Sequence, residues 1–431
     1  MRQHGAIIGG GIAGLLVAHV LADRFERLTV LERDYYPDQP KSLAPATRRG
    51  APQSRCLHLL TAAGAIAFDK LMPGWSKEVV ALGGIPFDAS ADSALWVSEG
   101  WLPRSPSGIV TYACSRSLVE AVLRRGLARK PNVRLREGQK VIGFLSGPRD
   151  FSVAGVCVDD QQGGGKTTLF ADLVVDASGT GSGLEHWISG LWNGIESSIP
   201  KTVVDSQMFY VSRWFHLEPA DAPNWCCLSA APTREAPYRA AIMLRVENDR
   251  WGVALLAFDN TLLPVDDSGF LDFAAGLCDG ELHRALVRAT PVSPIHHYGR
   301  SSNRVMRYDR LEAWPDGLAA LGDSACALDP YFGFGMTAAA RGAALLGMHF
   351  DQNCAEPISA HAFQKELTLL NAVPWQLATF RDFDGRILSN VQSRFRRLYA
   401  AAPGNAKIAH ALLSVQHMLL PLEALTEIEV S

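Results

Sequence analysis

Residues near the N-terminus have the types and spacing of a phosphate-binding turn. Gly9, Gly11 and Gly14 form the pattern Gly-x-Gly-x-x-Gly, and Glu32 follows 18 residues after the last glycine. In such a pattern the first glycine permits a tight turn, the second lets a pyrophosphate approach the backbone, and the third lets a helix pack closely on a strand. Glu32 is placed to accept hydrogen bonds from a ribose. The spacing predicts a dinucleotide site but does not distinguish FAD from NAD.

A second group of candidate residues lies far downstream. Asp323 follows the apolar run "LAAL", and the carboxyl ends of strands are where α/β sheets bind ligands. Gly333 and Gly335 lie in the loop "DPYFGFGM", before an Ala/Gly-rich segment that reads as a helix. The N-terminus of that helix would stabilise negative charge on a flavin ring. The same residues also fit an Asp-capped, Gly-rich turn before a tightly packed helix.

Several polar residues elsewhere could contact a cofactor. Arg116 precedes an expected helix over residues 117–128, where it could reach a pyrophosphate or lie at the surface. The segment "TRRGAPQSRCLHLLTAAG" contains Arg48, Gln53 and His58, which are candidates for the edge of an isoalloxazine ring. The alternative for this segment is a capped helix start with His58 satisfied in the core.

The elements that must position these residues follow from the apolar pattern. "GAIIG" reads as a buried strand, "IAGLLVAHVLAD" as a helix and "RLTVLE" as a second strand, which together form a βαβ unit. "ADLVVDASG" reads as a third strand followed by a turn of small residues. Residues 195–295 lack dinucleotide signals and alternate like half-buried strands, which would roof a substrate cavity. Their aromatic residues would either line that cavity or fill the sheet core: Trp192, Trp214, Phe215 and Trp225.

Composition excludes some classes of function. The 431 residues are 48% hydrophobic and 20% charged with a net charge of −3, which is typical of a globular protein of two or three domains. The sequence has no stripe of basic residues with interleaved aromatic residues, so it gives no indication of a nucleic-acid partner. The eight cysteines form no CxxC pair, so we expect free thiols and no metal. The glycines of the first apolar run argue against a signal peptide, and no stretch is apolar enough for stable membrane anchoring, so we expect a cytoplasmic protein.

The sequence resembles the flavoprotein monooxygenase superfamily that has a glutathione-reductase-type FAD domain and includes para-hydroxybenzoate hydroxylase. It is most similar to bacterial FAD-dependent epoxidases and hydroxylases of polyketide and terpenoid biosynthesis. The resemblance covers nearly the whole chain, and these motifs carry it: "IGGGIAGL", "VLERD", "RRGAPQSRCLHLL", "VVDASGTGS", "NRVMRYDRLEAWPDGLAALGDSACALDP" and "GFGMTAAARGAALL".

The resemblance implies an α/β fold with a Rossmann-like FAD-binding domain, an inserted mixed β-sheet substrate domain and a C-terminal helical region. The FAD-binding domain would comprise residues 1–80, 110–190 and 295–350, the substrate domain residues 81–109 and 191–294, and the helical region residues 351–431. Asp323 would lie on the ribityl chain and the loop from Gly333 to Met336 against the flavin ring. The implied cofactor-binding residues are Gly9, Gly11, Ile12, Ala13, Gly14, Glu32, Arg33, Arg48, Gln53, Arg116, Val141, Ala177, Gly322, Asp323, Pro330, Gly333, Gly335 and Met336.

Two positions depart from the pattern of the similar epoxidases. Phe334 stands between the two glycines of the flavin loop, where those enzymes usually have glutamine, and Asp329 stands before the loop proline, where they tend to have asparagine. We expect both residues to lie near the flavin. An additional aromatic side chain in this loop would alter where oxygen or substrate sits.

These features predict an FAD-dependent monooxygenase that epoxidises or hydroxylates a large apolar biosynthetic intermediate through a flavin C4a-hydroperoxide. Such chemistry requires no side-chain nucleophile or acid/base pair, and the sequence identifies no catalytic residue. No second dinucleotide fold is visible, so NAD(P)H would bind transiently or a separate flavin reductase would supply electrons. The alternative is a non-redox cyclase, such as a [4+2] cyclase that retains FAD, which Phe334 would suit. A flavin halogenase is less favoured, because the WxWxIP signature is missing and the nearest string is "RWGVALL".

Overall fold

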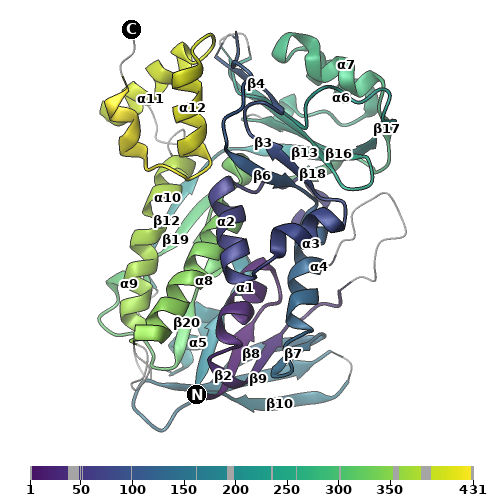
Figure 1. Cartoon of the computed structure of the whole chain (residues 1–431). Coiled ribbons are helices and arrows are strands. Elements are labelled where there is room, and N and C mark those ends of the chain that lie inside the picture. The colour runs from purple at the N-terminus through teal and green to yellow at the C-terminus, as the bar shows by residue number, and fades with distance from the viewer. Residues whose placement is uncertain are drawn as a thin grey trace.

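The structure is a computed structural model that describes residues 2–36, 48, 50, 52–98, 100–161, 163–191, 199–233, 236–258, 260–299, 302–352, 359–379 and 390–428. Figure 1 shows a mixed α/β fold in which a parallel sheet and its helices lie at one end and a largely antiparallel sheet lies at the other. The predicted fold class, α/β with a Rossmann-like sheet, is confirmed.

The parallel sheet has five strands in the order β20-β11-β1-β2-β7. The strands are β1 (Arg2–Ile8), β2 (Phe25–Leu31), β7 (Val133–Arg136), β11 (Leu173–Asp176) and β20 (Leu318–Ala320). All four pairings are parallel, so every strand ends at the same edge. Gly9 follows β1 and Asp323 follows β20, which brings two segments that are distant in sequence to one edge of the sheet.

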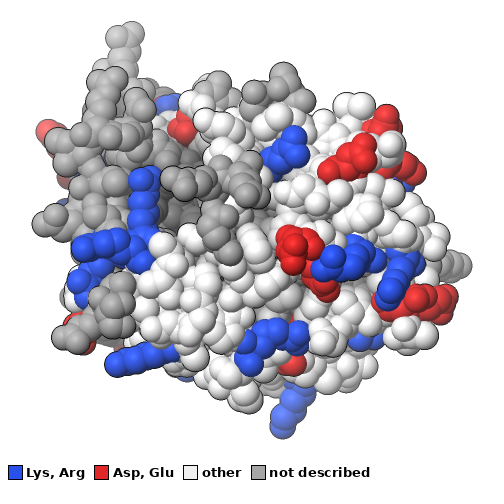
Figure 2. All heavy atoms as spheres, turned by 90° about the horizontal axis from the view of Figure 1, so that it is seen from above, with Lys and Arg blue, Asp and Glu red and all other residues white. Residues whose placement is uncertain are grey.

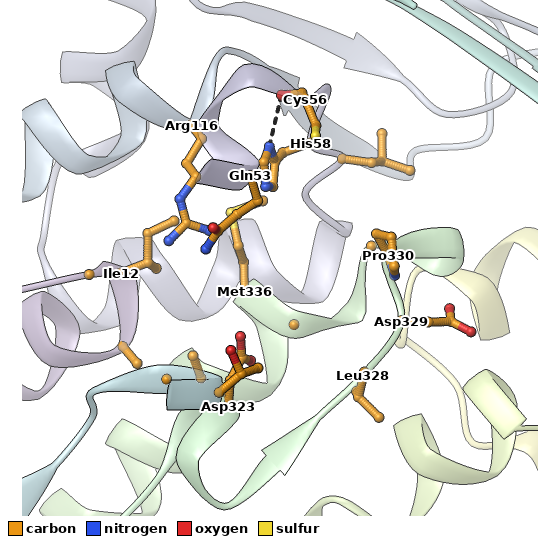
Figure 3. A pocket seen from close by; sticks show the side chains of 18 of the residues that line it. Ile12, Gln53, Cys56, His58, Arg116, Asp323, Leu328, Asp329, Pro330 and Met336 are labelled. Carbon is orange, nitrogen blue, oxygen red and sulfur yellow. Dashed lines mark hydrogen bonds between the residues drawn. The ribbon is translucent and has the colours of Figure 1, made fainter. Parts of the chain in front are cut away.

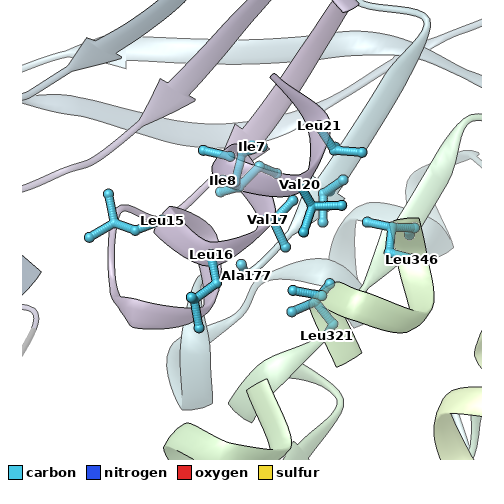
Figure 4. Close-up of a cluster of buried hydrophobic side chains, with 14 of the residues drawn as sticks. Ile7, Ile8, Leu15, Leu16, Val17, Val20, Leu21, Ala177, Leu321 and Leu346 are labelled. Carbon is cyan, nitrogen blue, oxygen red and sulfur yellow. The ribbon is translucent and has the colours of Figure 1, made fainter. Parts of the chain in front are cut away.

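Helices and a small antiparallel sheet bury both faces of this parallel sheet. The helices are α1 (Ile12–Leu21), α2 (Ala62–Leu71), α3 (Trp75–Ala81), α4 (Arg116–Leu127), α5 (Leu184–Leu191) and α8 (Phe334–Gln352), and the small sheet is β8 (Gln139–Ser146), β9 (Val153–Asp160) and β10 (Gly165–Phe170). Figure 4 shows Ile7 of β1, Leu16 of α1 and Leu346 of α8 in the core that results. This core fixes the start of α1 relative to the end of β1.

The second sheet has eight strands and carries two helices on one face. Its members are β4 (Ser93–Val97), β5 (Gly100–Trp101), β13 (Phe209–His216), β14 (Cys227–Ala230), β15 (Arg239–Val246), β16 (Arg250–Ala257), β17 (Thr290–Pro291) and β18 (His296–Tyr298), with α6 (Asp267–Ala275) and α7 (Glu281–Val287). Every residue of β16 is buried, which differs from the expected half-buried strand. One face of β16 packs on α6 and α7. The other face packs on residues that include Leu57 and Tyr331.

The remaining elements connect the two sheets and form the C-terminal region. They are β3 (Ile85–Asp88), β6 (Val110–Ala113), β12 (Lys201–Asp205), β19 (Ser302–Met306), β21 (Cys326–Ala327), α9 (Ala360–Leu370), α10 (Ala372–Thr379), α11 (Asn390–Ala401) and α12 (Ala406–Gln416). Of the helices in the described ranges, none combines the length and the apolar character that a bilayer crossing requires. On the face that Figure 2 shows, acidic and basic side chains are interspersed on a mostly uncharged surface.

Candidate functional site

A cavity of about 580 Å³ lies where the carboxyl edge of the parallel sheet faces the eight-stranded sheet. This volume is typical of small-molecule and cofactor sites, which span ~300–1,000 Å³. Most residues that the sequence suggested for the cofactor line it: Gly9, Gly11, Ile12, Ala13, Glu32, Arg33, Arg48, Gln53, Arg116, Val141, Ala177, Asp323, Pro330, Gly333, Gly335 and Met336. Figure 3 shows Arg116 and Gln53 on one side of this cavity and Asp323 on another.

Two of the expected contact residues do not line the cavity. A Cβ atom on Gly14 would lie 1.9 Å from the Gly9 carbonyl oxygen, so α1 packs directly on the turn that precedes it. A Cβ atom on Gly322 would lie 2.8 Å from the Ala13 Cβ atom. Both glycines therefore permit close approach of neighbouring segments, and for Gly14 this is the packing of helix on strand that its place in the glycine pattern predicted.

The turn after β1 has the geometry of an anion site. Gly9 has a φ of +94°, a conformation that favours glycine, and α1 begins directly after Gly11. A Cβ atom built on Gly11 would have the Nη2 atoms of Arg48 and Arg116 as its nearest neighbours, at 3.7 and 3.8 Å. Two guanidinium groups thus flank the N-terminus of a helix, and this combination fits the two negative charges of a pyrophosphate.

Glu32 both organises the turn and faces the cavity. Its Oε2 atom accepts a hydrogen bond from the Gly10 N–H over 2.8 Å, and its Oε1 atom accepts one from the Asp34 N–H over 3.0 Å. The Arg48 Nη1 atom lies 2.9 Å from Oε2. Because a carboxylate has about four acceptor positions, one position remains for a ligand hydroxyl. This arrangement suits a single hydrogen bond from a ribose.

Arg48, a candidate for the edge of the flavin, belongs to this charged cluster and lines the cavity. Its Nε atom lies 3.4 Å from Glu120 Oε2, and the Arg116 Nε atom lies 3.1 Å from Glu120 Oε1. Burial opposes the charge of Arg48, but the carboxylates of Glu120 and Glu32 outweigh this effect and raise its pKa. Glu120 therefore holds both arginines in place beside the N-terminus of α1.

The segment after β20 forms the second part of the site. The Asp323 carboxylate points into the cavity in Figure 3, and burial raises its pKa although Arg116 and Arg304 act in the opposite direction. Gly333 has a φ of +70°, and a Cβ atom there would lie 2.7 Å from the Leu59 carbonyl oxygen. The loop before α8 is thereby held close to the segment that carries Gln53 and His58. The N-terminus of α8 and a carboxylate thus meet beside the same cavity as the turn after β1.

His58 also lines the cavity, and its ring is neutral. Its Nδ1 atom lies 3.1 Å from the Cys56 carbonyl oxygen, to which a protonated Nδ1 donates a hydrogen bond. Burial, together with the positive charge of Arg116, lowers the pKa of His58 to about 3. The neutral ring presents Nε2 as a hydrogen-bond acceptor. The sequence left two alternatives for His58, a contact with the cofactor and a histidine satisfied in the core. The structure shows that its Nδ1 atom has a backbone partner and that the residue also lines the cavity.

Comparisons with known proteins identify the family. No protein-family model matches the chain. Protein Rv3254 of Mycobacterium tuberculosis is 30% identical over 360 residues, which cover 78% of this chain and 70% of that protein. Kynurenine 3-monooxygenase of Salinispora tropica is 25% identical over 355 residues, with the same coverage of 78% and 70%. The chain belongs to the FAD-dependent monooxygenase superfamily.

Solved structures agree with this assignment at the level of the fold. p-Nitrophenol 4-monooxygenase PnpA from Pseudomonas putida DLL-E4 superposes with a TM-score of 0.66 over 100% of this chain and 99% of its own, at 16% identity. The cofactor of the superfamily is FAD. The arginine donors beside Gly11 and the helix N-termini fit the negative charge of a pyrophosphate. The remaining acceptor position on Glu32 fits a hydroxyl group of a dinucleotide.

Phe334 does not line the cavity, although Gly333 and Gly335 on either side of it do, so its ring does not provide the additional aromatic group in the cavity that the sequence suggested. Its side chain is 1% exposed and stacks on Phe332 with ring centroids 5.3 Å apart. It packs among buried residues of the C-terminal helices, including Leu398 and Ile408. Asp329 does line the cavity. Its backbone N–H donates a hydrogen bond to Asn303 Oδ1 over 2.8 Å, which holds Asp329 in place.

Three of the four aromatic residues that the sequence suggested for the cavity or the core fill the core. Trp214, Phe215 and Trp225 are 1%, 2% and 4% exposed, and none of them lines the cavity. Trp192 lies outside the described residues. The sheet presents mainly small and aliphatic side chains to the cavity, among them Ala240, Ile242, Ala254 and Leu256, and Tyr210 is the aromatic side chain that it adds.

The sheet was expected to roof the cavity, but sequence reasoning did not identify which of its side chains face the cavity, and it missed the wall next to the sheet. Ala240 pairs with Leu256 and Ile242 pairs with Ala254 across β15 and β16, so these side chains share one face. Their period of two was a usable signal, because alternate residues of a strand point to one side. Tyr399 and Gln416 also line the cavity but come from C-terminal helices. No local pattern marked them, since only long-range packing brings them to the site.

Proposed function

We propose that this chain is an FAD-dependent monooxygenase that transfers one oxygen atom of O₂ to a large, mostly apolar substrate. The observation that carries the proposal is a single cavity that runs from the charged turn after β1 to the apolar face of the eight-stranded sheet. Membership of the superfamily supports the oxygen chemistry, and a cofactor held at the charged turn would face a substrate that lies at the sheet. Bound FAD would supply O₂ activation once it is reduced.

The residues of this chain would hold the cofactor at three places. Arg116 and the N-terminus of α1 would hold the pyrophosphate, Glu32 would accept a hydrogen bond from the ribose, and Asp323 would accept one from another hydroxyl. The N-terminus of α8 would favour negative charge at the flavin ring. These contacts bind and orient, and none of them needs to donate or remove a proton during oxygen transfer.

The wall of the cavity supports an apolar substrate. Among the described residues that line it, the basic side chains are Arg33, Arg48, Arg116 and Lys140, and all four belong to the part around the parallel sheet. The sheet contributes mainly alanines and aliphatic side chains. An anionic substrate would need cationic partners there, whereas an apolar substrate gains from burial and displaces water from the reaction.

Electrons must reach the cofactor from outside the chain. We propose that NAD(P)H binds transiently or that a separate flavin reductase supplies them. Steady-state oxidation of NADH and NADPH by the FAD-loaded protein, each with and without an added reductase, distinguishes these two sources. Oxidation that a substrate accelerates without the reductase supports direct use of NAD(P)H.

Mass spectrometry of turnover tests the proposal. The FAD-loaded protein is incubated with a panel of unsaturated polyketide-like and terpenoid-like compounds, with reductant, and under isotopically labelled O₂. We expect a product that gains one labelled oxygen atom, and no product when either O₂ or reductant is omitted. An isomer of unchanged mass formed without O₂ would contradict the proposal and indicate a cyclase, the function for which Phe334 no longer provides an argument. A halogenated product that requires added halide would also contradict it.

A further inference from the structure

The eight-stranded sheet contains a buried ion pair outside the cavity. Glu247 lies in the turn between β15 and β16, and its side chain pairs with that of Arg250, the first residue of β16. Glu247 is 5% exposed and Arg250 is 2% exposed. Neither residue lines the cavity. Because removing two charges from water costs free energy, stability alone does not account for a pair at this depth.

The carboxylate of Glu247 holds the N-terminus of α4. Its Oε2 atom accepts a hydrogen bond from the Ser115 N–H over 2.9 Å, and its Oε1 atom accepts one from the Ser115 hydroxyl. Ser115 is the N-cap of α4, since its Oγ atom accepts a hydrogen bond from the Leu118 N–H over 3.2 Å. A negative charge at this end of a helix is favourable. Both carboxylate oxygens of Glu247 thus contact the residue that directly precedes Arg116.

Arg250 fixes the Glu247 carboxylate in turn. Its Nη2 atom donates to Glu247 Oε1, and its Nε atom donates to the backbone carbonyl oxygen of Glu247 over 3.2 Å. The Arg250 guanidinium lies over the Trp214 ring, 5.7 Å from the ring centroid. The Trp214 indole N–H donates to the Arg55 carbonyl oxygen over 2.7 Å. Glu247 is therefore a fixed point of the sheet rather than a side chain that follows the movement of α4.

The position of Arg116 depends on the backbone at Ser115. Arg116 is the first residue of α4, and its Nη2 atom lies 3.8 Å from the Cβ position of Gly11, directly before α1. Glu120, one turn later, fixes the Arg116 Nε atom at 3.1 Å. Because Glu120 belongs to the same helix, it sets the direction of the arginine side chain but not the place of the helix end. Glu247 comes from the other sheet and supplies that second constraint.

We infer that Glu247 is a positioning residue for FAD, because it fixes the backbone at Ser115 and thereby holds the Arg116 guanidinium where a pyrophosphate would bind. The inference rests on the proposed function, in which Arg116 holds the pyrophosphate. It adds a residue that does not touch the cavity and that belongs to the eight-stranded sheet. Loss of the Glu247 carboxylate should therefore lower the affinity for FAD only as far as Arg116 contributes to that affinity.

A double-mutant cycle on FAD affinity tests the inference. The FAD-loaded protein is diluted, and the fluorescence of the released FAD gives the dissociation constant for the wild type, Glu247→Gln, Arg116→Ala and the protein with both substitutions. Ser115→Gly, alone and with Arg116→Ala, is a second series, because glycine is nearly as good an N-cap as serine but offers no hydroxyl to Glu247. Glu281→Gln is the matched control, since Glu281 accepts a hydrogen bond from Trp225 Nε1 over 3.1 Å but lies on α7 and does not line the cavity.

We expect Glu247→Gln to weaken FAD binding about 10-fold and Ser115→Gly, which keeps the N–H contact, about 3-fold, within the range for coupled residues of one network. Glu281→Gln should match the wild type. In the Arg116→Ala background, either substitution should change the affinity less than about 2-fold, because no guanidinium remains to be positioned. Melting temperatures establish that the variants are folded, and the Ser115→Gly series decides if Glu247→Gln does not fold.

Three results would overturn the inference. A general loss of stability would weaken FAD binding equally with and without Arg116, and that additivity would leave Glu247 with a structural role alone. Unchanged affinity in folded Glu247→Gln and Ser115→Gly proteins would show that Arg116 needs no such support. Unchanged affinity in Arg116→Ala would overturn the inference together with the assignment of Arg116 to the pyrophosphate. The measurement needs no turnover, so a failure of oxygen transfer would leave it valid.

Discussion

The pH dependence of stability tests how the C-terminal helices are fixed to the cofactor-binding part. His417 follows α12 and is buried, and its Nδ1 atom accepts a hydrogen bond over 3.1 Å from the N–H of Ala62, the first residue of α2. Burial lowers the pKa of His417 to about 4, although the Asp88 carboxylate acts in the opposite direction. A proton on Nδ1 would remove this acceptor and place positive charge at a helix N-terminus, where the dipole is unfavourable.

The size of the effect follows from the two pKa values of His417. The unfolded-state value is about 6.5, so between pH 6.5 and the folded-state value the unfolded chain binds more protons than the folded chain. The stability that the neutral imidazole provides is therefore complete above the unfolded pKa and is lost as the pH falls. The loss from this one residue is about 2 kcal/mol at pH 5 and about 3 kcal/mol at pH 4.

His417→Asn isolates this contribution, because the Asn Oδ1 atom can accept from Ala62 but does not titrate. The free energy of unfolding is measured with urea at pH 7 and pH 5 for the wild type, for His417→Asn and for His410→Asn. His410 is an exposed residue on the same helix, so its substitution controls for the loss of a histidine. We expect the wild type and His410→Asn to lose about 2 kcal/mol more than His417→Asn between these pH values. An equal loss in all three proteins would refute the reasoning.

Three further predictions concern the cavity. Gly14→Ala places a Cβ atom 1.9 Å from the Gly9 carbonyl oxygen, so we expect a lower melting temperature and less bound FAD by absorbance, whereas Gly190→Ala, with open space around its Cβ position, should match the wild type. Arg116→Ala should weaken FAD binding about 10- to 150-fold when apoprotein is titrated with FAD, the range for one charge-assisted hydrogen bond, and an unchanged affinity would remove Arg116 from the site. Ala254→Phe fills the sheet side of the cavity, so FAD absorbance should persist while turnover of large substrates falls; undiminished turnover would show that substrates bind elsewhere.

The cofactor half of the site could be read from the sequence because its requirements are local. Gly9 needs a positive φ, Gly14 needs space for a carbonyl oxygen, and Glu32 must end a strand beside the turn. Each requirement leaves a signature in residue type and spacing within one βαβ unit. The strands β1 and β2 and the helix α1 therefore lie close to their expected positions.

The substrate half could not be read in the same way, because its side-chain directions depend on distant packing. The sequence places Phe334 between two glycines, but the first turn of α8 directs the ring into a cluster with Leu398 and Ile408. Trp214 and Trp251 lie on strands whose alternation suggested one exposed face, yet both are 1% exposed, because the sheet is covered on both sides. The spacing of residues along a strand does not show which distant helix or loop packs on each face of the sheet.

The two halves of the cavity are therefore constrained differently, and this difference bears on how the protein can change its substrate. The charged turn after β1 depends on backbone conformation and on buried charges that share partners, such as Glu120 between Arg48 and Arg116, so a substitution there disturbs several groups at once. The wall depends on the sizes of side chains such as Ala254. Substitutions in the wall alter cavity shape while the contacts to the cofactor persist. Substrate selectivity should consequently vary among relatives at the sheet and the C-terminal helices, with the charged turn retained.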